Sequence, residues 1–146
     1  MIAIVLGTRP EIIKMSPIIR ECEARKLDYF ILHTGQHYSY DMDAIFFEEL
    51  CLPKAKYRLD IGSGPHGQQT GKMLAGIEDV LLKESPDYVV VLGDPNTPLA
   101  GALAAAKLHI PVCHVEAGRR SHNRRMPEEI NRIVIDHISD CLCAPT

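Results

Sequence analysis

The sequence predicts an α/β protein built on a doubly wound parallel sheet, and two observations support this fold class. Short apolar runs of strand type alternate along the chain with longer segments of helical periodicity. The apolar runs also contain few polar residues, as in Tyr88-Val-Val-Val-Leu92, which is typical of strands covered by helices on both faces. The alternation continues without a linker-like stretch, so we expect one domain over residues 1–146.

Five strands and five helices follow from these patterns. We expect strands at residues 2–6, 28–34, 87–93, 110–115 and 141–144. We expect helices at residues 11–25, 41–50, 68–84, 97–108 and 127–140, each with apolar residues three or four positions apart. Right-handed crossovers then produce a Rossmann-like arrangement. Two irregular stretches, 57–67 and 118–126, are expected to form loops at a ligand site.

Composition and charge exclude several classes of partner. Hydrophobic residues make up 46% of the chain and charged residues 24%, which is ordinary for a soluble globular protein. The net charge of -3 comes from interspersed acids and bases, so we expect no nucleic-acid partner held by electrostatics alone. No apolar run is long enough to cross a membrane, and no signal peptide is expected because Met1 leads directly into a strand.

The five cysteines are odd in number and unevenly spaced. Most of them lie in apolar runs, which favours reduced, buried thiols and a cytoplasmic protein. Cys141 and Cys143 would share one face of a strand, but no histidine pair with metal-ligand spacing accompanies them. We therefore expect no metal site.

Polar residues follow four of the expected strands at the point where each strand ends. They occur in GTRPE at 7–11, HTGQH at 33–37, GD at 93–94 and HVEAG at 114–118. In an open parallel sheet the carboxyl ends of the strands share one edge, and ligands bind there. We expect these four segments to face a single crevice.

The first turn has the features of an anion site. Pro10 suits the first position of a helix, and the free amides of the first helical turn favour negative groups. Arg9 adds a forked donor and Lys14 lies one helical turn further on, so we expect both to bind a diphosphate. The alternative is that Arg9 pairs with Glu11 or Asp94 as a structural contact. The G-x-G-x-x-G pattern is absent here, so no nicotinamide cofactor is expected.

Asp94 and Glu116 are the candidate acid–base pair. Each follows an apolar strand, and burial would raise the proton affinity of Asp94. The alternative for Asp94 is capping of the helix that follows it. Glu128 is a third candidate, although it lies four positions before Arg132 and the two could form a solvated salt bridge. The sequence leaves that choice open.

The histidines fall into two groups, those in expected strands and those in expected loops. His33 and His114 lie in expected strands and are predicted to belong to the core or to support the site. His37 and His66 lie in loops and are predicted to contact the ligand, together with Gln36.

These motifs together resemble the amino-terminal domain of the non-hydrolysing UDP-N-acetylglucosamine 2-epimerases. The resemblance covers essentially the whole chain. It is carried by GTRPE, HTGQH, HVEAG, the GD pair followed by LAGALAAAK at 99–107, and RRMPEEINR at 124–132 running into DHISD and APT. One departure is Pro95, which replaces the polar residue usual after the GD pair and removes an amide donor there.

The resemblance implies a function and a set of roles. This domain would be the first lobe of a glycosyltransferase-B-type fold, with UDP between two lobes and the second lobe absent from the chain. The family interconverts UDP-GlcNAc and UDP-ManNAc by eliminating UDP to 2-acetamidoglucal and adding it back, without metal or nicotinamide. Residues carried over by motif are Asp94, Glu116 and Glu128 as catalytic carboxylates, and Gly7, Thr8, Arg9, Lys14, Gln36, His37 and His66 in substrate binding.

Three further expectations accompany this assignment. The isolated chain is expected to be inactive, because leaving diphosphate and bases must be aligned together by both lobes. A homodimer is expected by family analogy. Two rival functions remain open, namely the lobe of a nucleotide-sugar glycosyltransferase and a non-catalytic Rossmann-like module.

Overall fold

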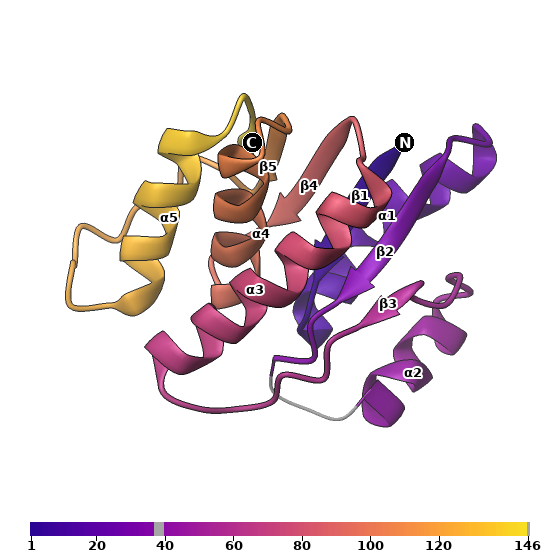
Figure 1. The fold of residues 1–146 in the computed structure, drawn as a ribbon, viewed down its shortest axis with the longest axis horizontal. Coiled ribbons are helices and arrows are strands. Elements are labelled where there is room, and N and C mark those ends of the chain that lie inside the picture. The colour runs from indigo at the N-terminus through magenta and orange to yellow at the C-terminus, as the bar shows by residue number, and fades with distance from the viewer. Residues whose placement is uncertain (37–39, 146) are drawn as a thin grey trace.

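A six-stranded parallel sheet forms the centre of the computed structural model, which describes residues 1–36 and 40–145 (Figure 1). Its strands are β1 (Ile2–Leu6), β2 (Tyr29–His33), β3 (Tyr57–Arg58), β4 (Tyr88–Leu92), β5 (Val112–Val115) and β6 (Cys141–Cys143). The helices are α1 (Arg9–Ala24), α2 (Tyr40–Glu49), α3 (His66–Glu84), α4 (Asn96–Lys107) and α5 (Pro127–Ile138). The doubly wound α/β prediction is confirmed.

The strands lie in the order β3-β2-β1-β4-β5-β6. Pairing starts at β1, where Ile2 aligns with Tyr29 on one side and with Tyr88 on the other. The order therefore reverses between β1 and β4, which is the switch point where such sheets bind ligands. The expected segments agree with the observed ones to within about two residues. The exception is β3, which lies in a stretch that we expected to be a loop.

Helices cover both faces of the sheet. Buried residues of α3, α4 and α5 pack on one face together with Val5, Val89 and Val91. Buried residues of α1 and α2 pack on the other face with Ile4 and Leu6. The strands alternate between the two cores, which explains why their sequences are apolar at nearly every position.

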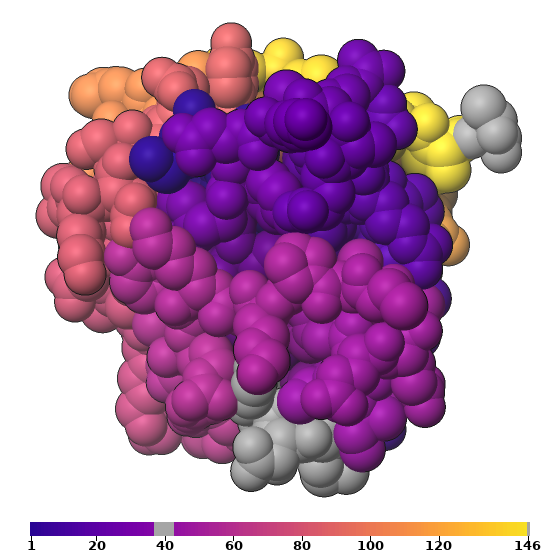
Figure 2. All heavy atoms as spheres, turned by 90° about the vertical axis from the view of Figure 1, so that its right-hand side faces the viewer, coloured from indigo at the N-terminus to yellow at the C-terminus, as the bar shows by residue number. Residues whose placement is uncertain are grey.

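The two cores do not extend equally far along the sheet. Of β5, Val112 belongs to the α3, α4 and α5 core and Val115 packs partly against the α1 and α2 core, whereas neither core includes a described residue of β6. At the opposite edge β3 and α2 form one side of the molecule (Figure 2). No helix in the described part of the chain is long and apolar enough to cross a membrane.

The expectation of buried cysteines was wrong for most of them. Only Cys22 is buried, whereas Cys51, Cys141 and Cys143 are exposed and Cys113 is half-buried. All five are free thiols. For Cys141 and Cys143 the reason is that β6 is the edge strand of the described sheet, so an apolar run there does not produce burial.

Candidate active site

A cleft of about 350 Å³ opens beside the carboxyl end of β4, in the size range of small-molecule sites. Its walls come from the loop after β2, the segment before α3, the start of α4 and the start of α5. The lining residues are Gln36, Ser63, Gly64, His66, Gln69, Asp94, Pro95, Asn96, Pro127, Glu128 and Asn131. Four of the predicted site residues therefore meet here, namely Gln36, His66, Asp94 and Glu128.

Side-chain amides hold these segments together. Gln69 Nε2 donates to the carbonyls of Gln36 and Gly62, each at 2.9 Å. Asn96 Nδ2 donates to Gln69 Oε1 at 2.9 Å, and Asn131 Nδ2 donates to Asn96 Oδ1 at 3.2 Å. The chain of amides crosses the floor of the cleft from one wall to the other. Because these groups are buried and paired, the cleft is preorganised before any ligand binds.

Asp94 points into the cleft but is not deeply buried, contrary to expectation. Its Oδ2 accepts hydrogen bonds from Arg132 Nε at 2.8 Å and Nη2 at 2.6 Å, and 30% of its side chain is exposed. Its carbonyl accepts from Asn131 at 2.8 Å. The start of α4 has no side-chain cap, so the capping alternative for Asp94 is not supported. Arg132 instead fixes one carboxylate oxygen and leaves the group accessible.

Glu116 lies at the end of β5, next to the same strand end. Its Oε1 forms an ion pair with Lys14 Nζ at 2.8 Å. Its Oε2 lies 3.6 Å from the position that a Cβ on Gly93 would occupy, directly before Asp94. The backbone of Glu116 has a positive φ of 64°, which a non-glycine residue rarely adopts. Lys14 and Glu116 do not line the cleft, and their ion pair lies beside Gly93, at the strand end that precedes Asp94.

Glu128 lines the cleft, and no ion pair joins it to Arg132 among the described residues. Arg132 pairs with Asp94 and with Glu129, at 3.2 Å from Glu129 Oε1. Glu129 is buried and also accepts the backbone amides of Ser121 at 3.0 Å and His122 at 2.8 Å. These bonds, led by that of Ser121, lower the pKa of Glu129 to about 2. Glu129 thus ties the basic loop 118–126 to α5.

Replacing Glu129 by glutamine should loosen this loop. An amide offers a single acceptor oxygen, so one of the two loop amides loses its partner and the charge opposite Arg132 disappears. We expect tryptic cleavage after Arg124 or Arg125 to become roughly tenfold faster, since cleavage requires local opening. Glu128→Gln is the matched control because it removes the same charge one position away. Equal cleavage rates in both variants would contradict the role of Glu129.

Arg9 lies at the start of α1, with a third of its side chain exposed. Its Nε is 3.7 Å from Asp43 Oδ1, and its guanidinium lies 5.3 Å from the centre of the Phe46 ring. The alternative in which Arg9 pairs with Glu11 or Asp94 is therefore not what the structure shows. Asp43 also contacts His33 Nε2 at 3.0 Å, and burial raises the pKa of Asp43 and lowers that of His33. Arg9 is thus held against α2.

Glu11 reaches back from α1 to the two residues that precede the helix. Its Oε2 accepts from the Gly7 amide at 3.1 Å and from Thr8 Oγ1 at 2.7 Å, and its other oxygen is buried with no hydrogen-bond partner among the described residues. Thr8 and Glu11 have the spacing of a capping box, in which a glutamate reaches back to the helix start. Burial raises the pKa of Glu11 from its ordinary value of 4.5 to about 7. Glu11 therefore titrates near neutral pH beside the crevice.

The raised pKa of Glu11 predicts a specific pH dependence of stability. Between pH 4.5 and 7 the unfolded chain loses this proton while the folded chain keeps it, so stability falls as pH rises through this window. The contribution lost is about 3 kcal/mol. Glu11→Gln removes the ionisation. We expect the unfolding free energy of the variant, relative to wild type, to increase by that amount between pH 4.5 and 7 in urea titrations, whereas parallel curves would refute the assignment.

His114 is buried in β5 and contacts the backbone directly before Asp94, as expected for a strand histidine that supports the site. It contacts Asp136 Oδ1 at 2.6 Å through Nδ1 and donates from Nε2 to the Gly93 carbonyl at 2.8 Å. Asp136 also accepts from the Gly118 amide at 2.9 Å and from Arg120 at 2.7 Å. Burial alone would raise the pKa of Asp136, but these hydrogen bonds outweigh it and lower the pKa.

Comparison with known proteins identifies the family. The family described as UDP-N-acetylglucosamine 2-epimerase matches residues 20–146 of the chain. A UDP-N-acetylglucosamine 2-epimerase of Methanocaldococcus jannaschii is 68% identical over 99% of this chain. The chain belongs to the UDP-N-acetylglucosamine 2-epimerase family.

Relatives of this epimerase family differ in the substrate that they are named for. A Methanococcus maripaludis UDP-N-acetylglucosamine 2-epimerase is 65% identical over 99% of the chain. A Pseudomonas aeruginosa UDP-2,3-diacetamido-2,3-dideoxy-D-glucuronate 2-epimerase is 56% identical over 97% of it. The chain spans about 40% of the length of these relatives.

Solved epimerase structures share the fold. The Methanocaldococcus jannaschii enzyme in complex with UDP-GlcNAc and UDP superposes with a TM-score of 0.96 over 99% of this chain and 40% of that one. The Neisseria meningitidis enzyme bound to UDP-GlcNAc superposes with a TM-score of 0.92 at 36% identity, over 99% of this chain and 40% of that one. The chain therefore has the fold of the corresponding part of these epimerases.

The sequence predicted most of the strand-end residues of the site but not the residues that they contact. Gly7 and Thr8 lie at the first turn as expected, and His37 lies outside the described residues. Arg132, Glu129, Asn131 and Gln69 were missed as site residues. The T-x-x-E spacing of residues 8–11 was the available signal for the contact that Glu11 makes. The partners of Asp94 had no local signal, since they lie on a helix far along the chain.

Proposed function

We propose that this chain is the first lobe of a UDP-N-acetylglucosamine 2-epimerase that interconverts UDP-GlcNAc and UDP-ManNAc. The observation that carries the proposal is the convergence of Asp94, Glu128 and the Lys14–Glu116 pair around the carboxyl ends of β4 and β5. Acid–base chemistry at a sugar carbon needs carboxylates on a preorganised edge, and departure of a diphosphate needs cations nearby. The second lobe would close over this edge and complete the uridine site.

The proposed reaction proceeds by elimination and re-addition. One carboxylate removes the proton at C2 while the C1–O bond to UDP breaks, leaving 2-acetamidoglucal and UDP. UDP then adds back to C1 as C2 receives a proton on the opposite face. Asp94, Glu116 and Glu128 are the candidates for these proton transfers, and Arg9 and Lys14 are the candidates for binding the diphosphate.

Binding of the substrate diphosphate to Lys14 would release the Glu116 carboxylate from its ion pair. Lys14 is about half exposed, so a diphosphate can reach its ammonium group without rearrangement of the fold. A doubly charged diphosphate competes with Glu116 for Lys14, and the carboxylate then faces the sugar. Gln36 and His66 complete the wall of the cleft, with His66 Nδ1 placed 3.0 Å from Asn96 Nδ2.

A second candidate substrate is UDP-2,3-diacetamido-2,3-dideoxy-D-glucuronate, because the Pseudomonas aeruginosa relative named for it is 56% identical. The same C2 chemistry applies to both sugars. The higher identity to enzymes named for UDP-GlcNAc favours that substrate. A homodimer and a cytoplasmic location complete the proposal, and the five reduced thiols are compatible with that compartment.

The proposal is tested by joining this chain to the second lobe of a related epimerase. We would replace the matching segment of the Methanocaldococcus jannaschii epimerase with residues 1–146 of this chain and assay UDP-GlcNAc in D₂O. We expect UDP-ManNAc carrying deuterium at C2, because the proton removed exchanges with solvent. Transfer of the sugar to an acceptor would instead support a glycosyltransferase lobe. A folded chimera that neither epimerises either sugar nor exchanges the C2 proton would overturn the proposal.

The isolated 146-residue chain should be inactive. Much of the barrier reduction requires the leaving UDP to be held and aligned, and one lobe cannot do this alone. We expect no turnover of UDP-GlcNAc and UDP binding no tighter than about 1 mM in calorimetry, near 4 kcal/mol. Turnover by the purified chain would contradict the two-lobe account.

A further inference from the structure

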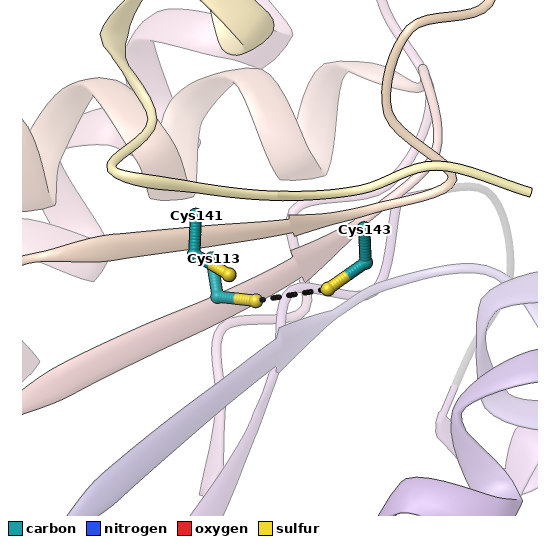
Figure 3. A group of neighbouring side chains, drawn as sticks. All are labelled: Cys113, Cys141 and Cys143. Atoms are coloured by element: carbon teal, nitrogen blue, oxygen red, sulfur yellow. Dashed lines mark hydrogen bonds between the residues drawn. The ribbon is translucent and has the colours of Figure 1, made fainter.

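Three cysteines from two strands converge at the uncovered edge of the sheet (Figure 3). Cys113 lies on β5 opposite Cys141 on β6, and Cys143 lies two positions further along β6. Residues at these positions project from the same face of the sheet, which is the face opposite α4 and α5. Their three sulfur atoms all lie within 4.8 Å of one another.

The spacing of the sulfur atoms fits a metal ion. Cys113 Sγ and Cys143 Sγ are 3.7 Å apart. Two thiolates bound to one tetrahedral ion at about 2.3 Å are separated by about 3.8 Å. The third sulfur needs a shift of no more than about 1 Å to reach the same separation, which a small side-chain rotation supplies.

The chemistry of the ligands selects the kind of ion. The cluster contains only thiols, and within the described residues no histidine or carboxylate belongs to it. Sulfur ligands favour soft or borderline ions over Mg²⁺ or Ca²⁺. Exposure of Cys141 and Cys143 leaves an entry path and room for a solvent molecule.

We propose that Cys113, Cys141 and Cys143 form a three-thiolate site for a divalent d¹⁰ metal ion such as Zn²⁺, with solvent as the fourth ligand. Each thiol releases its proton as its metal–sulfur bond forms, so no oxidant or reductant is involved.

The site would reinforce the part of the sheet that presents Glu116. The carbonyl of Cys143 accepts the amide of Ala117 at 3.1 Å, directly after Glu116. A metal ion bridging β5 and β6 thus secures the edge strand beside that turn. The inference does not depend on the proposed epimerase activity, because it concerns residues outside the cleft.

The test uses the reduced chain under argon with Cd²⁺ as the probe. We expect thiolate-to-metal charge-transfer absorption that saturates at one Cd²⁺ per chain and is displaced by competing Zn²⁺. Cys141→Ser and Cys143→Ser should each weaken Cd²⁺ binding by at least about 100-fold. Removing a residue that only contacts a metal ligand weakens metal binding by up to about 100-fold, and removing a ligand itself should cost more. Cys51→Ser is the matched control, since Cys51 is also an exposed free thiol.

The outcomes separate clearly. Loss of binding in both β6 variants, with Cys51→Ser unchanged, supports the site. Absence of a saturable signal in the wild-type chain overturns it, and so does a loss in Cys51→Ser equal to that in Cys143→Ser. Because both substituted β6 positions are exposed, far-ultraviolet circular dichroism should confirm that the variants fold as wild type does.

Discussion

Asp94→Asn should lower kcat by about 10²–10⁴-fold in an epimerase that carries this chain as its first lobe, with a much smaller change in KM. The substitution preserves the shape of the side chain and the contact between the Asp94 carbonyl and Asn131. It removes the negative charge that Arg132 holds in place through two contacts. An amide cannot accept the C2 proton, so the loss should appear in the chemical step.

Two measurements distinguish a catalytic role from a structural one. The rate of deuterium incorporation at C2 should fall in parallel with kcat, while the melting temperature changes little. Asp79→Asn on α3 is the matched control, because Asp79 is exposed and lies outside the cleft. If Asp94→Asn keeps kcat within threefold of the control, Asp94 takes no part in proton transfer.

Gly7→Ala should produce the largest loss of stability among the substitutions considered. A Cβ at this position would lie 1.9 Å from Thr34 Oγ1 and 2.5 Å from Thr97 Oγ1. Both hydroxyls are buried and bonded to each other at 2.8 Å, and Thr97 Oγ1 also donates to Gln36 Oε1 at 2.8 Å. The methyl group therefore displaces a hydrogen-bonded pair that joins β2 to α4. We expect a loss of about 3 kcal/mol in the free energy of unfolding, the upper part of the range for overpacking.

Urea unfolding of Gly7→Ala and Gly71→Ala provides the comparison. Apart from the backbone of its own helix, no described residue in contact range lies within 4 Å of a Cβ at Gly71, which is inside α3, so alanine there should stabilise the chain by about 0.5–1 kcal/mol. The two substitutions add the same atom and differ only in their surroundings. Similar stabilities of the two variants would show that the turn between β1 and α1 adapts more readily than its geometry indicates.

The location of the crevice could be predicted because it depends on local patterns. Alternating runs indicated a parallel sheet, and the polar residues Asp94 and Glu116 come directly after two of its strands. Their meeting at one edge then follows from the direction of the strands alone. The two-residue strand β3 was not predictable in this way, since Tyr57–Arg58 is too short to show a period and is recruited by pairing with β2.

The residues that contact Asp94 could not be predicted from local patterns. Arg132 could have paired with Glu128 on its own helix, but docking of α5 beside the end of β4 places it against Asp94. The three thiols show the same dependence, because the strand order brings Cys113 beside β6. Neither contact has a signature in the residues next to it.

The sequence by itself determined the fold class, the strand-end motifs and the family to which the chain belongs. Hydrophobic periodicity and motif spacing are local properties, so they can be read without knowing which segments touch. Only the tertiary structure decided which cation holds each carboxylate, how Glu11 becomes buried and how three cysteines meet. These features depend on the packing of segments far apart in the chain, where burial and distance set the strength of each charge.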